Sequence, residues 1–573
     1  VKAGKRVAIC EQLEDPKKTK KIVKRGVTEL ITPGVSLNDE VLDTTKNNFL
    51  ASVVFGDKMG VSFLDISTGE FLIAEGDYNH MKKLINNFSP SEILYSKSER
   101  NVINDKIPGE FYFYPIDDWI FDKQFAVDQI VTHFKTNSLK GFGVDHFNEG
   151  VIAAGSILYY LNQNKHSKLN HIINLKRIDE TSYVWLDSFT IKNLELLTSS
   201  EVNGASLIDV IDQTCTPMGA RMLRNWLLFP LKSLVEINNR LEFVDFFKKK
   251  NKTLEDAINL LSEVGDVERM LSKIATLRIS PRELNKFKES LISCNNLKEL
   301  LVNHPDFSHL KDLFSVYSNS HELIETIDTQ LNPDAPVQIV KGGVMNSGVC
   351  EELDSYRELA SSSEKVLDQI KSREIENTGI SSLKIAYNNV FGYYLEVRNT
   401  HKDKVPENWI RKQTLVSAER YITEELKELE VEIINAKSKI QELESELYYD
   451  LVNTIIPSIS HIQKNAFLVA QVDCLSCFSV IASNNNYSKP IVNDSFKIEI
   501  KNGRHPVIES VFESSQDYIP NDIYLDDQQQ QVIMITGPNM SGKSAILRQT
   551  AIICLLAQIG CFVPAEKLKM GII

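Results

Sequence analysis

The chain has 573 residues, 42% of them hydrophobic and 25% charged, a composition that is ordinary for soluble globular domains. This length exceeds what one hydrophobic core supports and predicts about four folding units, and no apolar run approaches the ~20 residues that a membrane-spanning helix requires. The net charge of −13 argues against a protein that coats nucleic acid indiscriminately, so any DNA binding has to depend on local clusters of Lys and Arg.

The two ends and the cysteines bear on whether the chain is a fragment and on the cell compartment in which it works. No secretory signal follows Val1, and the final "AEKLKMGII" reads as part of a strand, so we expect a chain that is truncated at both ends. The eight cysteines lack the spacing of a disulfide framework, which is typical of a reducing cytoplasm. Cys474 and Cys477 form a CxxC pair without further thiols or imidazoles nearby, so we expect buried helix cysteines and no zinc site.

Residues 1–36 form a first basic segment, which ends in the turn-forming sequence Thr32-Pro33-Gly34. Its positive residues are Lys2, Lys5, Arg6, Lys17, Lys18, Lys20, Lys21, Lys24 and Arg25. Charge alone does not distinguish a solvated surface from a segment close to DNA, and both interpretations stay open.

Residues 45–180 have the pattern of a compact α/β domain. The β-like runs "FLASVVFG" and "GVSFLDIST" flank a predicted hairpin turn at 57–60, and helical periodicity follows around 79–88 and 151–164. Asp65, on the second run, could belong to a metal-dependent nuclease site. Two-metal chemistry needs several converging carboxylates, and no others can be placed, so a structural role for Asp65 is favoured.

Residues 190–375 are predicted to be all-α, because apolar residues recur at helical spacing with few Gly or Pro among them. Two stretches have the alternating spacing of three and four residues that is typical of coiled-coil arms. The first contains Leu353, Tyr356, Ala360, Ser363, Leu367 and Ile370, and the second contains Ile422, Leu426, Leu429, Ile433, Ala436, Ile440, Leu443 and Leu447. A helix over 419–451 would be about 50 Å long and would act as a lever.

Between these arms, residues 383–417 change to strand character, with the runs "LKIAYN" and "GYYLEVR". This second basic segment contains Lys384, Arg398, Lys402, Lys404, Arg411 and Lys412. A small positive sheet at the tip of a long helical pair suits contacts with a DNA phosphate backbone that ignore sequence, and a merely solvated tip is the alternative. Tyr393 and Tyr394 are interpreted as strand packing rather than base stacking.

The most specific motif is a complete Walker A sequence between a predicted strand, "QVIMIT", and a predicted helix over 543–558. The loop consists of Gly537, Pro538, Asn539, Met540, Ser541, Gly542, Lys543 and Ser544. In such a loop the backbone N–H groups surround the phosphates, Lys543 approaches the β and γ oxygens, and the Ser544 hydroxyl ligates Mg²⁺. The helix N-terminus adds positive potential, so ATP or ADP with Mg²⁺ is the predicted ligand.

Hydrolysis requires more than nucleotide binding. A carboxylate for Mg²⁺ and a group that positions the attacking water usually follow on a later strand, and the chain ends before such an element. We therefore expect no catalytic residue in this chain, poor binding and little hydrolysis by the chain alone, and weak ATPase activity in a longer version.

The sequence "TGPNMSGKSAILRQTA" at 536–551 resembles the Walker A block of the MutS family, and its Pro-Asn-Met insert is far more specific than the general phosphate loop. Further stretches resemble the same family in the same order. They are "VAICEQLEDP" at 7–16, "ITPGV" at 31–35, "LDISTGEF" at 64–71, "TPMGARMLRNWLLFPL" at 216–231, "GDVERMLSKIA" at 265–275, "FGYYLEV" at 391–397, "RKQTLVSAERYITEEL" at 411–426 and "GRHPVIE" at 503–509.

The resemblance implies a multidomain fold that combines α/β and all-α parts. The expected domains are the remnant of an α/β mismatch-binding domain at 1–40, an RNase H-like connector at 45–180, a helical lever core at 181–375, a small β clamp at 376–425, returning lever helices at 426–490 and part of an ABC-type P-loop ATPase domain at 491–573. It also implies a homodimer that encircles duplex DNA and recognises mismatches or small loops. ATP would convert it into a sliding clamp that recruits a MutL-type partner, in the cytoplasm at the nucleoid.

Besides the phosphate loop at 537–544, three positions carry over from the family motifs, and three expected elements fall outside the chain. Tyr518 matches the aromatic residue that stacks on adenine, and Arg411 and Lys412 fall in the stretch that touches the DNA backbone. Ala545 stands where many members have Thr, with little effect expected because the preceding serine keeps its hydroxyl. The mismatch-probing Phe-x-Glu motif is expected upstream of the first residue, and the signature segment and dimerising helices are expected after the last.

Three alternatives remain at this point. A MutS paralogue acting on recombination junctions or stalled ribosomes would, without a mismatch domain, lack the segment at 7–16. A structural coiled-coil ATPase of the chromosome-condensing kind would place its phosphate loop before its coiled coils rather than after them. An RNase H-type nuclease depends on Asp65 alone and would require Mg²⁺-dependent cutting of plain duplex.

Overall fold

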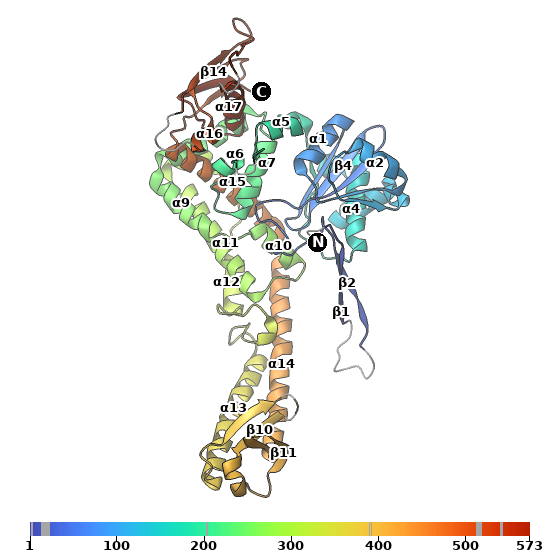
Figure 1. Cartoon of the computed structure of the whole chain (residues 1–573), viewed down its shortest axis with the longest axis vertical. Helices are drawn as coiled ribbons and strands as arrows, with labels where there is room; N and C mark the ends of the chain where they lie inside the picture. The colour runs from blue at the N-terminus through green and yellow to red at the C-terminus, as the bar shows by residue number, and fades with distance from the viewer. Residues whose placement is uncertain are drawn as a thin grey trace. The chain divides into compact units, whose positions relative to one another are not determined.

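The structure is a computed structural model that describes residues 1, 4–12, 23–201, 204–388, 390, 392–511, 518–538 and 542–573. The chain forms two compact units (Figure 1). The first unit consists of Val1–Arg278, Glu289–Ser320 and Ile456–Ile573, and the second consists of Ile279–Lys288 and His321–Ile455.

The first unit contains a six-stranded mixed sheet in the order β7-β6-β3-β4-β5-β8. Its strands are β3 (Leu50–Phe55), β4 (Met59–Asp65), β5 (Glu70–Gly76), β6 (Glu92–Ser96), β7 (Phe113–Ile116) and β8 (Lys176–Arg177). Helices α3 (Lys123–Phe134) and α4 (Glu149–Gln163) cover one face, and α1 (Tyr78–Phe88) covers the other, with α2 (Arg100–Lys106) nearby. The predicted hairpin and the predicted helices around 79–88 and 151–164 are confirmed.

Both faces of this sheet are buried, which explains why its central strands read as almost continuous apolar runs. Leu50 and Val54 pack into the core beneath α3 and α4, whereas Ala51 and Val53 pack into the core beneath α1. A separate antiparallel hairpin precedes the sheet and consists of β1 (Val7–Gln12) and β2 (Arg25–Ile31).

The rest of the first unit is mainly helical, as predicted. Its helices are α5 (Ser188–Asn193), α6 (Leu207–Ile211), α7 (Pro217–Leu228), α8 (Leu234–Lys249), α9 (Asn251–Glu263), α10 (Val267–Ala275) and α15 (Ile459–Asn484), and α11 (Pro281–Val302) lies partly in each unit. α15 is buried along most of its length and packs against α7, α8, α9 and α10. Within the described residues, the one helical stretch with the length and hydropathy of a membrane span is Glu424–Asn484, and 78% of its apolar window lies inside the protein.

The first unit ends in a four-stranded sheet in the order β13-β16-β14-β15. Its elements are β13 (Ile491–Asn493), β14 (Ile498–Gly503), α16 (Pro506–Val511), β15 (Asn521–Leu525), α17 (Lys543–Gln558) and β16 (Lys567–Gly571). The helix predicted over 543–558 is therefore confirmed, and so is the strand character of the last residues.

The strand predicted for "QVIMIT" is wrong in this structure. Residues 532–538 are irregular, and Val532 and Met534 are 82% and 86% exposed. A buried strand has to pair its backbone with neighbours, and no described strand pairs with this segment. Part of it lines an apolar cavity of about 540 Å³ together with Ile523, Leu547 and Cys554.

The second unit consists of α12 (His321–Gln330), two long helices and a small sheet. The long helices α13 (Glu351–Thr378) and α14 (Glu424–Ile455) lie side by side (Figure 1). The antiparallel sheet has the order β11-β12-β10-β9 and consists of β9 (Lys384–Asn388), β10 (Gly392–Arg398), β11 (Ile410–Thr414) and β12 (Ala418–Ile422). Most of the predicted coiled-coil positions are buried, namely Leu353, Ala360, Ser363, Leu367, Ile370, Leu426, Leu429, Ile433 and Ala436.

The start of the second arm was predicted too early. The helix begins at Glu424 rather than near 419, because 418–422 forms β12, which pairs with both β10 and β11. Ile422, counted in the helical repeat, lies opposite Ile410 in the sheet. Pairing on both sides of β12 satisfies its backbone groups and outweighs one turn of helical periodicity.

Candidate functional site

The phosphate loop leads directly into α17. Gly542 caps this helix with φ +81°, a left-handed conformation that favours glycine, and Lys543 is the first helical residue. The Lys543 ammonium donates a hydrogen bond to the carbonyl of Gly537. Gly537 and Pro538 are exposed and irregular, and Ser544 is exposed in the first turn. Asn539, Met540 and Ser541 lie outside the described residues.

This arrangement fits a bound phosphate group. The first turn of α17 presents backbone N–H groups without intrahelical partners at the positive end of the helix dipole. Lys543 adds a full positive charge at the same end, and the Ser544 hydroxyl is an oxygen donor of the kind that Mg²⁺ accepts. The residues present are therefore able to hold the phosphates of a nucleotide.

Tyr518 is connected to the same helix. Its hydroxyl donates a hydrogen bond of 2.7 Å to the side-chain oxygen of Gln549, which is completely buried on α17. Burial raises the pKa of the half-buried Tyr518. The neighbouring His505 is neutral, since burial and the nearby Arg548 charge lower its pKa to about 4. This contact fixes Tyr518 relative to α17.

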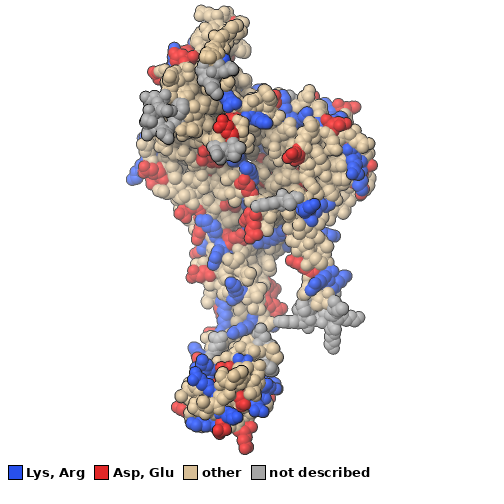
Figure 2. Space-filling view, viewed as in Figure 1, with Lys and Arg blue, Asp and Glu red and all other residues tan. Residues whose placement is uncertain are grey.

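All six predicted backbone-contacting residues of the small sheet are exposed. They are Lys384 on β9, Arg398 at the end of β10, Lys402 and Lys404 in the 3₁₀ segment Asn399–Lys404, and Arg411 and Lys412 on β11. Between 384 and 422 the sequence has seven Lys and Arg but four Asp and Glu, a positive local balance in a chain with a net charge of −13. Figure 2 shows these positive side chains interspersed with acidic ones.

Two of these residues differ in their surroundings. Arg411 lies 3.4 Å from the buried Glu419 carboxylate, whose pKa is lowered by a hydrogen bond from Tyr421 and by the Arg411 charge. A bulge in the pairing of β11 with β12 falls between Arg411 and Gln413. It interrupts the alternation that sends neighbouring strand residues to opposite faces, so Arg411 and Lys412 are not forced apart.

The N-terminal basic segment is only partly described, since Lys2, Lys17, Lys18, Lys20 and Lys21 lie outside the described residues. Arg6 makes contacts within the protein. Its guanidinium lies 4.1 Å from the centre of the Tyr114 ring and donates to the Asn164 side chain at 3.1 Å. For this residue the structure favours an internal contact over DNA proximity.

Asp65 has the structural role that was favoured. Its completely buried carboxylate accepts hydrogen bonds from the backbone N–H groups of Asn48 and Ser67, at 3.0 and 2.9 Å. Cys474 and Cys477 are buried in α15, where burial raises the pKa of both thiols well above the usual value. The described part of the chain contains no cluster of three or more His, Cys, Asp or Glu side chains suited to a metal ion.

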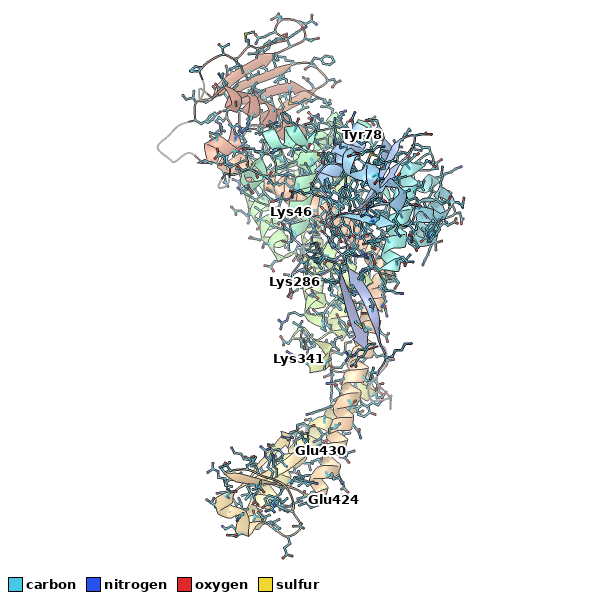
Figure 3. All side chains as sticks on the ribbon, turned by 45° about the vertical axis from the view of Figure 1, so that its right-hand side comes forward. Lys46, Tyr78, Lys286, Lys341, Glu424 and Glu430 are labelled. Atoms are coloured by element: carbon cyan, nitrogen blue, oxygen red, sulfur yellow. The ribbon has the colours of Figure 1, made fainter. Side chains whose placement is uncertain are left out.

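Sequence reasoning missed a buried charge network that joins α7 and α10 to residues 43–46, the segment that precedes β3. Arg221 on α7 forms a two-pronged ion pair with Asp266, at 2.7 and 2.8 Å, and a further pair with Glu268 at 2.7 Å. Arg269 on α10 donates to the backbone carbonyl of Lys46, at 2.9 Å. Figure 3 labels Lys46. The available signal was the presence of charged residues at core positions of otherwise apolar helix faces.

Comparison with known proteins places the whole arrangement in one family. The family described as MutS domain III matches residues 189–479, and the descriptions MutS domain I, II and V match 1–40, 48–173 and 533–573. The DNA mismatch repair proteins MutS of Flavobacterium psychrophilum and Flavobacterium johnsoniae are each 54% identical to this chain over 574 residues. That of Parabacteroides distasonis is 52% identical over 577 residues.

These alignments cover 100% of the chain and 66% of each relative, so the chain spans slightly less than two thirds of their length. The match to MutS domain III alone includes more than half of the chain. The sequence block at 7–16 lies within the range matched by MutS domain I, and the block at 536–551 lies within the range matched by MutS domain V. The chain belongs to the MutS family.

Proposed function

We propose that this chain acts in the ATP-dependent recognition of mismatched base pairs and small loops in duplex DNA, the step that initiates mismatch repair. The observation that carries the proposal is the 54% identity, over the full length of the chain, with relatives named DNA mismatch repair protein MutS. The domain I match at 1–40 favours this function over that of a paralogue without a mismatch-binding domain.

In this proposal the nucleotide site is formed by Gly537 to Ser544, with Tyr518 stacking on adenine. Lys543 neutralises phosphate charge, and Ser544 ligates Mg²⁺. Bound ATP would supply the γ-phosphate that is hydrolysed in the full-length protein, where further residues complete a weak ATPase. The hydrogen bond from Tyr518 to Gln549 supports this role, because it connects the adenine-side residue to the helix that begins at the phosphates.

The exposed positive residues of β9 to β11 are proposed to contact the phosphate backbone. Such contacts position a protein on duplex DNA without reading its sequence. The proposal extends to a homodimer that closes around DNA as a sliding clamp, engages a MutL-type partner, and works in the cytoplasm at the nucleoid. The exposure of Arg398, Lys402 and Arg411 and the excess of positive over negative residues between 384 and 422 support phosphate contact by these residues.

The test compares DNA affinities of the full-length protein with and without nucleotide. We expect tighter binding to a duplex with one mismatch than to the matched duplex. Adding ATP and Mg²⁺ should release the protein from the mismatched site. Four-way junction DNA and ribosomes serve as competitors. Equal binding of matched and mismatched duplex, or preferential binding of a competitor, would contradict the proposal.

A further inference from the structure

The C-terminal end of α17 is attached to the helical core by an arginine. Arg240 on α8 donates a hydrogen bond of 2.9 Å to the carbonyl of Ile559, the residue that caps α17. The last carbonyl groups of a helix lack intrahelical partners and carry partial negative charge, so a cation is stabilising there. Arg240 therefore satisfies the end of α17 that is opposite to the phosphate loop.

The surroundings of Arg240 are unusual for a charged side chain. Its guanidinium lies 3.4 Å from the centre of the Trp226 ring on α7, and among the described residues no carboxylate lies within ion-pair distance of it. Burial lowers the pKa of Arg240 to about 10, so the group stays protonated at neutral pH. A cation held by an aromatic face and a helix end, rather than by an ion pair, depends on the position of both.

Two further contacts make this joint specific. The buried Gln558 side chain donates a hydrogen bond of 2.6 Å to the carbonyl of Leu231, in the loop between α7 and α8. Gly560 has φ +85°, and a Cβ atom there would lie 2.4 Å from the Cβ of Arg240. Close approach of the two backbones thus requires glycine. We call Arg240, Trp226, Gln558, Leu231 and Gly560 the α17 joint.

α17 connects the phosphate loop with this joint as one rigid element. Its 16 residues, Lys543–Gln558, correspond to about 24 Å of helix. A displacement of the N-terminal end of α17 on phosphate binding would therefore be carried to Gln558 and Ile559. From there the hydrogen bonds of the α17 joint would carry it to α8 and to the loop after α7.

We propose that Arg240 is a positioning residue that couples the state of the nucleotide site to the helical core. The inference rests on the proposed function, which supplies a nucleotide signal to transmit. Lysine cannot replace arginine in this role, because a single ammonium group lacks the planar fork that stacks on Trp226 while donating to Ile559. Arg240 touches no substrate and acts through α17.

The experiment uses the full-length protein with Arg240→Lys and Gln558→Met, and with Lys249→Met as the control. Lys249 lies on the same helix, where it pairs with Asp245 on the surface. Affinity for ATP and the ATP-induced release from mismatched duplex are measured separately. We expect ATP affinity to stay within about threefold of wild type, while the acceleration of release falls by about tenfold in both joint variants and is unchanged in the control.

The possible outcomes separate the inference from the function on which it rests. If ATP fails to release wild-type protein from mismatched duplex, the proposed function is wrong. If ATP releases the wild-type protein, and releases folded Arg240→Lys or Gln558→Met equally fast, the role of Arg240 is overturned. A merely structural role would lower ATP affinity and release in parallel.

Hydrogen exchange of the wild-type protein provides a measurement that no folding defect can obscure. Adding ATP should change amide exchange at 236–244 of α8 as well as along α17. A change that is confined to α17 would overturn the coupling.

Discussion

Replacing Glu444 by Ala should loosen the pairing of α13 with α14. The Glu444 carboxylate is completely buried on α14 and accepts hydrogen bonds from the backbone N–H groups of Gly343 and Val344, at 3.1 and 3.3 Å. It also forms an ion pair of 2.5 Å with Arg357 on α13. One side chain thus connects three segments of the second unit.

The magnitude follows from what the substitution leaves behind. Removing one partner of a buried ion pair typically costs about 3–5 kcal/mol, because the other charge stays buried without compensation. The Arg357 side chain is 24% exposed and keeps its contact with Asp354, so the lower end of this range applies. A cost of about 3 kcal/mol corresponds to a hundredfold change in a local opening equilibrium, at about 1.4 kcal/mol per factor of ten.

Amide hydrogen exchange is the appropriate assay, because a chain with two units does not unfold as a single two-state system. Protection along 351–362 and 438–450 should fall by about a hundredfold in Glu444→Ala. The control is Glu425→Ala, on the same helix. Glu425 pairs with Arg373 of α13, but the two side chains are 49% and 50% exposed, so its loss should cost less than about 1 kcal/mol.

The comparison can refute the reasoning in two ways. Less than about fivefold loss of protection in Glu444→Ala would mean that burial does not increase the free energy lost when this ion pair is broken. Equal losses in the two variants would mean that only the number of ion pairs between the helices matters. Both substitutions create the residue with the highest helix propensity, so helix propensity does not explain a difference.

Three further predictions concern charged side chains of the small sheet, the phosphate loop and β5. Replacing Arg411 and Lys412 by Gln should weaken binding to matched and mismatched duplex equally. In a salt titration it should reduce the slope of log affinity against log salt by about 2, and an unchanged slope would exclude phosphate contact. Lys543→Ala should lower nucleotide affinity at least about tenfold in equilibrium binding, and unaltered affinity would contradict its proposed role. Burial and the neighbouring Glu268 raise the pKa of Glu70 from 4.5 to about 7, so the folded state retains a proton that the unfolded state releases. Its stabilising contribution is full below 4.5 and is lost as the pH rises through 7, so thermal unfolding of Glu70→Gln should depend less on pH over this interval. An identical pH dependence in wild type and variant would show that Glu70 titrates normally.

Much of the architecture could be predicted because it follows from hydrophobic periodicity. The spacing of Leu353, Ala360 and Leu367 predicted a helix with one buried face, and these residues are buried on α13. Periodicity failed where backbone pairing competes with it, as for Ile422 in β12. It failed in the opposite direction at 532–538, where an apolar run lacks a described strand with which to pair.

The candidate sites were predictable to the extent that local sequence defines them. The Walker A motif predicted the helix that begins at Lys543, because its glycine, lysine and helix start are contiguous. The network around Arg221 and the contact of Arg240 with Ile559 join residues that are distant in sequence. Their pairing depends on tertiary packing, which composition and spacing do not specify.

The buried polar contacts of the helical core have a common physical purpose. The attraction between apolar surfaces is non-directional, whereas a hydrogen bond weakens as its length and angle depart from the preferred geometry. Asp473 on α15 accepts hydrogen bonds from the backbone N–H groups of Cys215 and Thr216, at 2.9 and 2.8 Å, and so fixes the start of α7. Further along α7, Trp226 carries the guanidinium of Arg240. α7 is therefore held near its start by α15 and contacts the α17 joint near its end, which is the arrangement that the proposed coupling of α17 to the core requires.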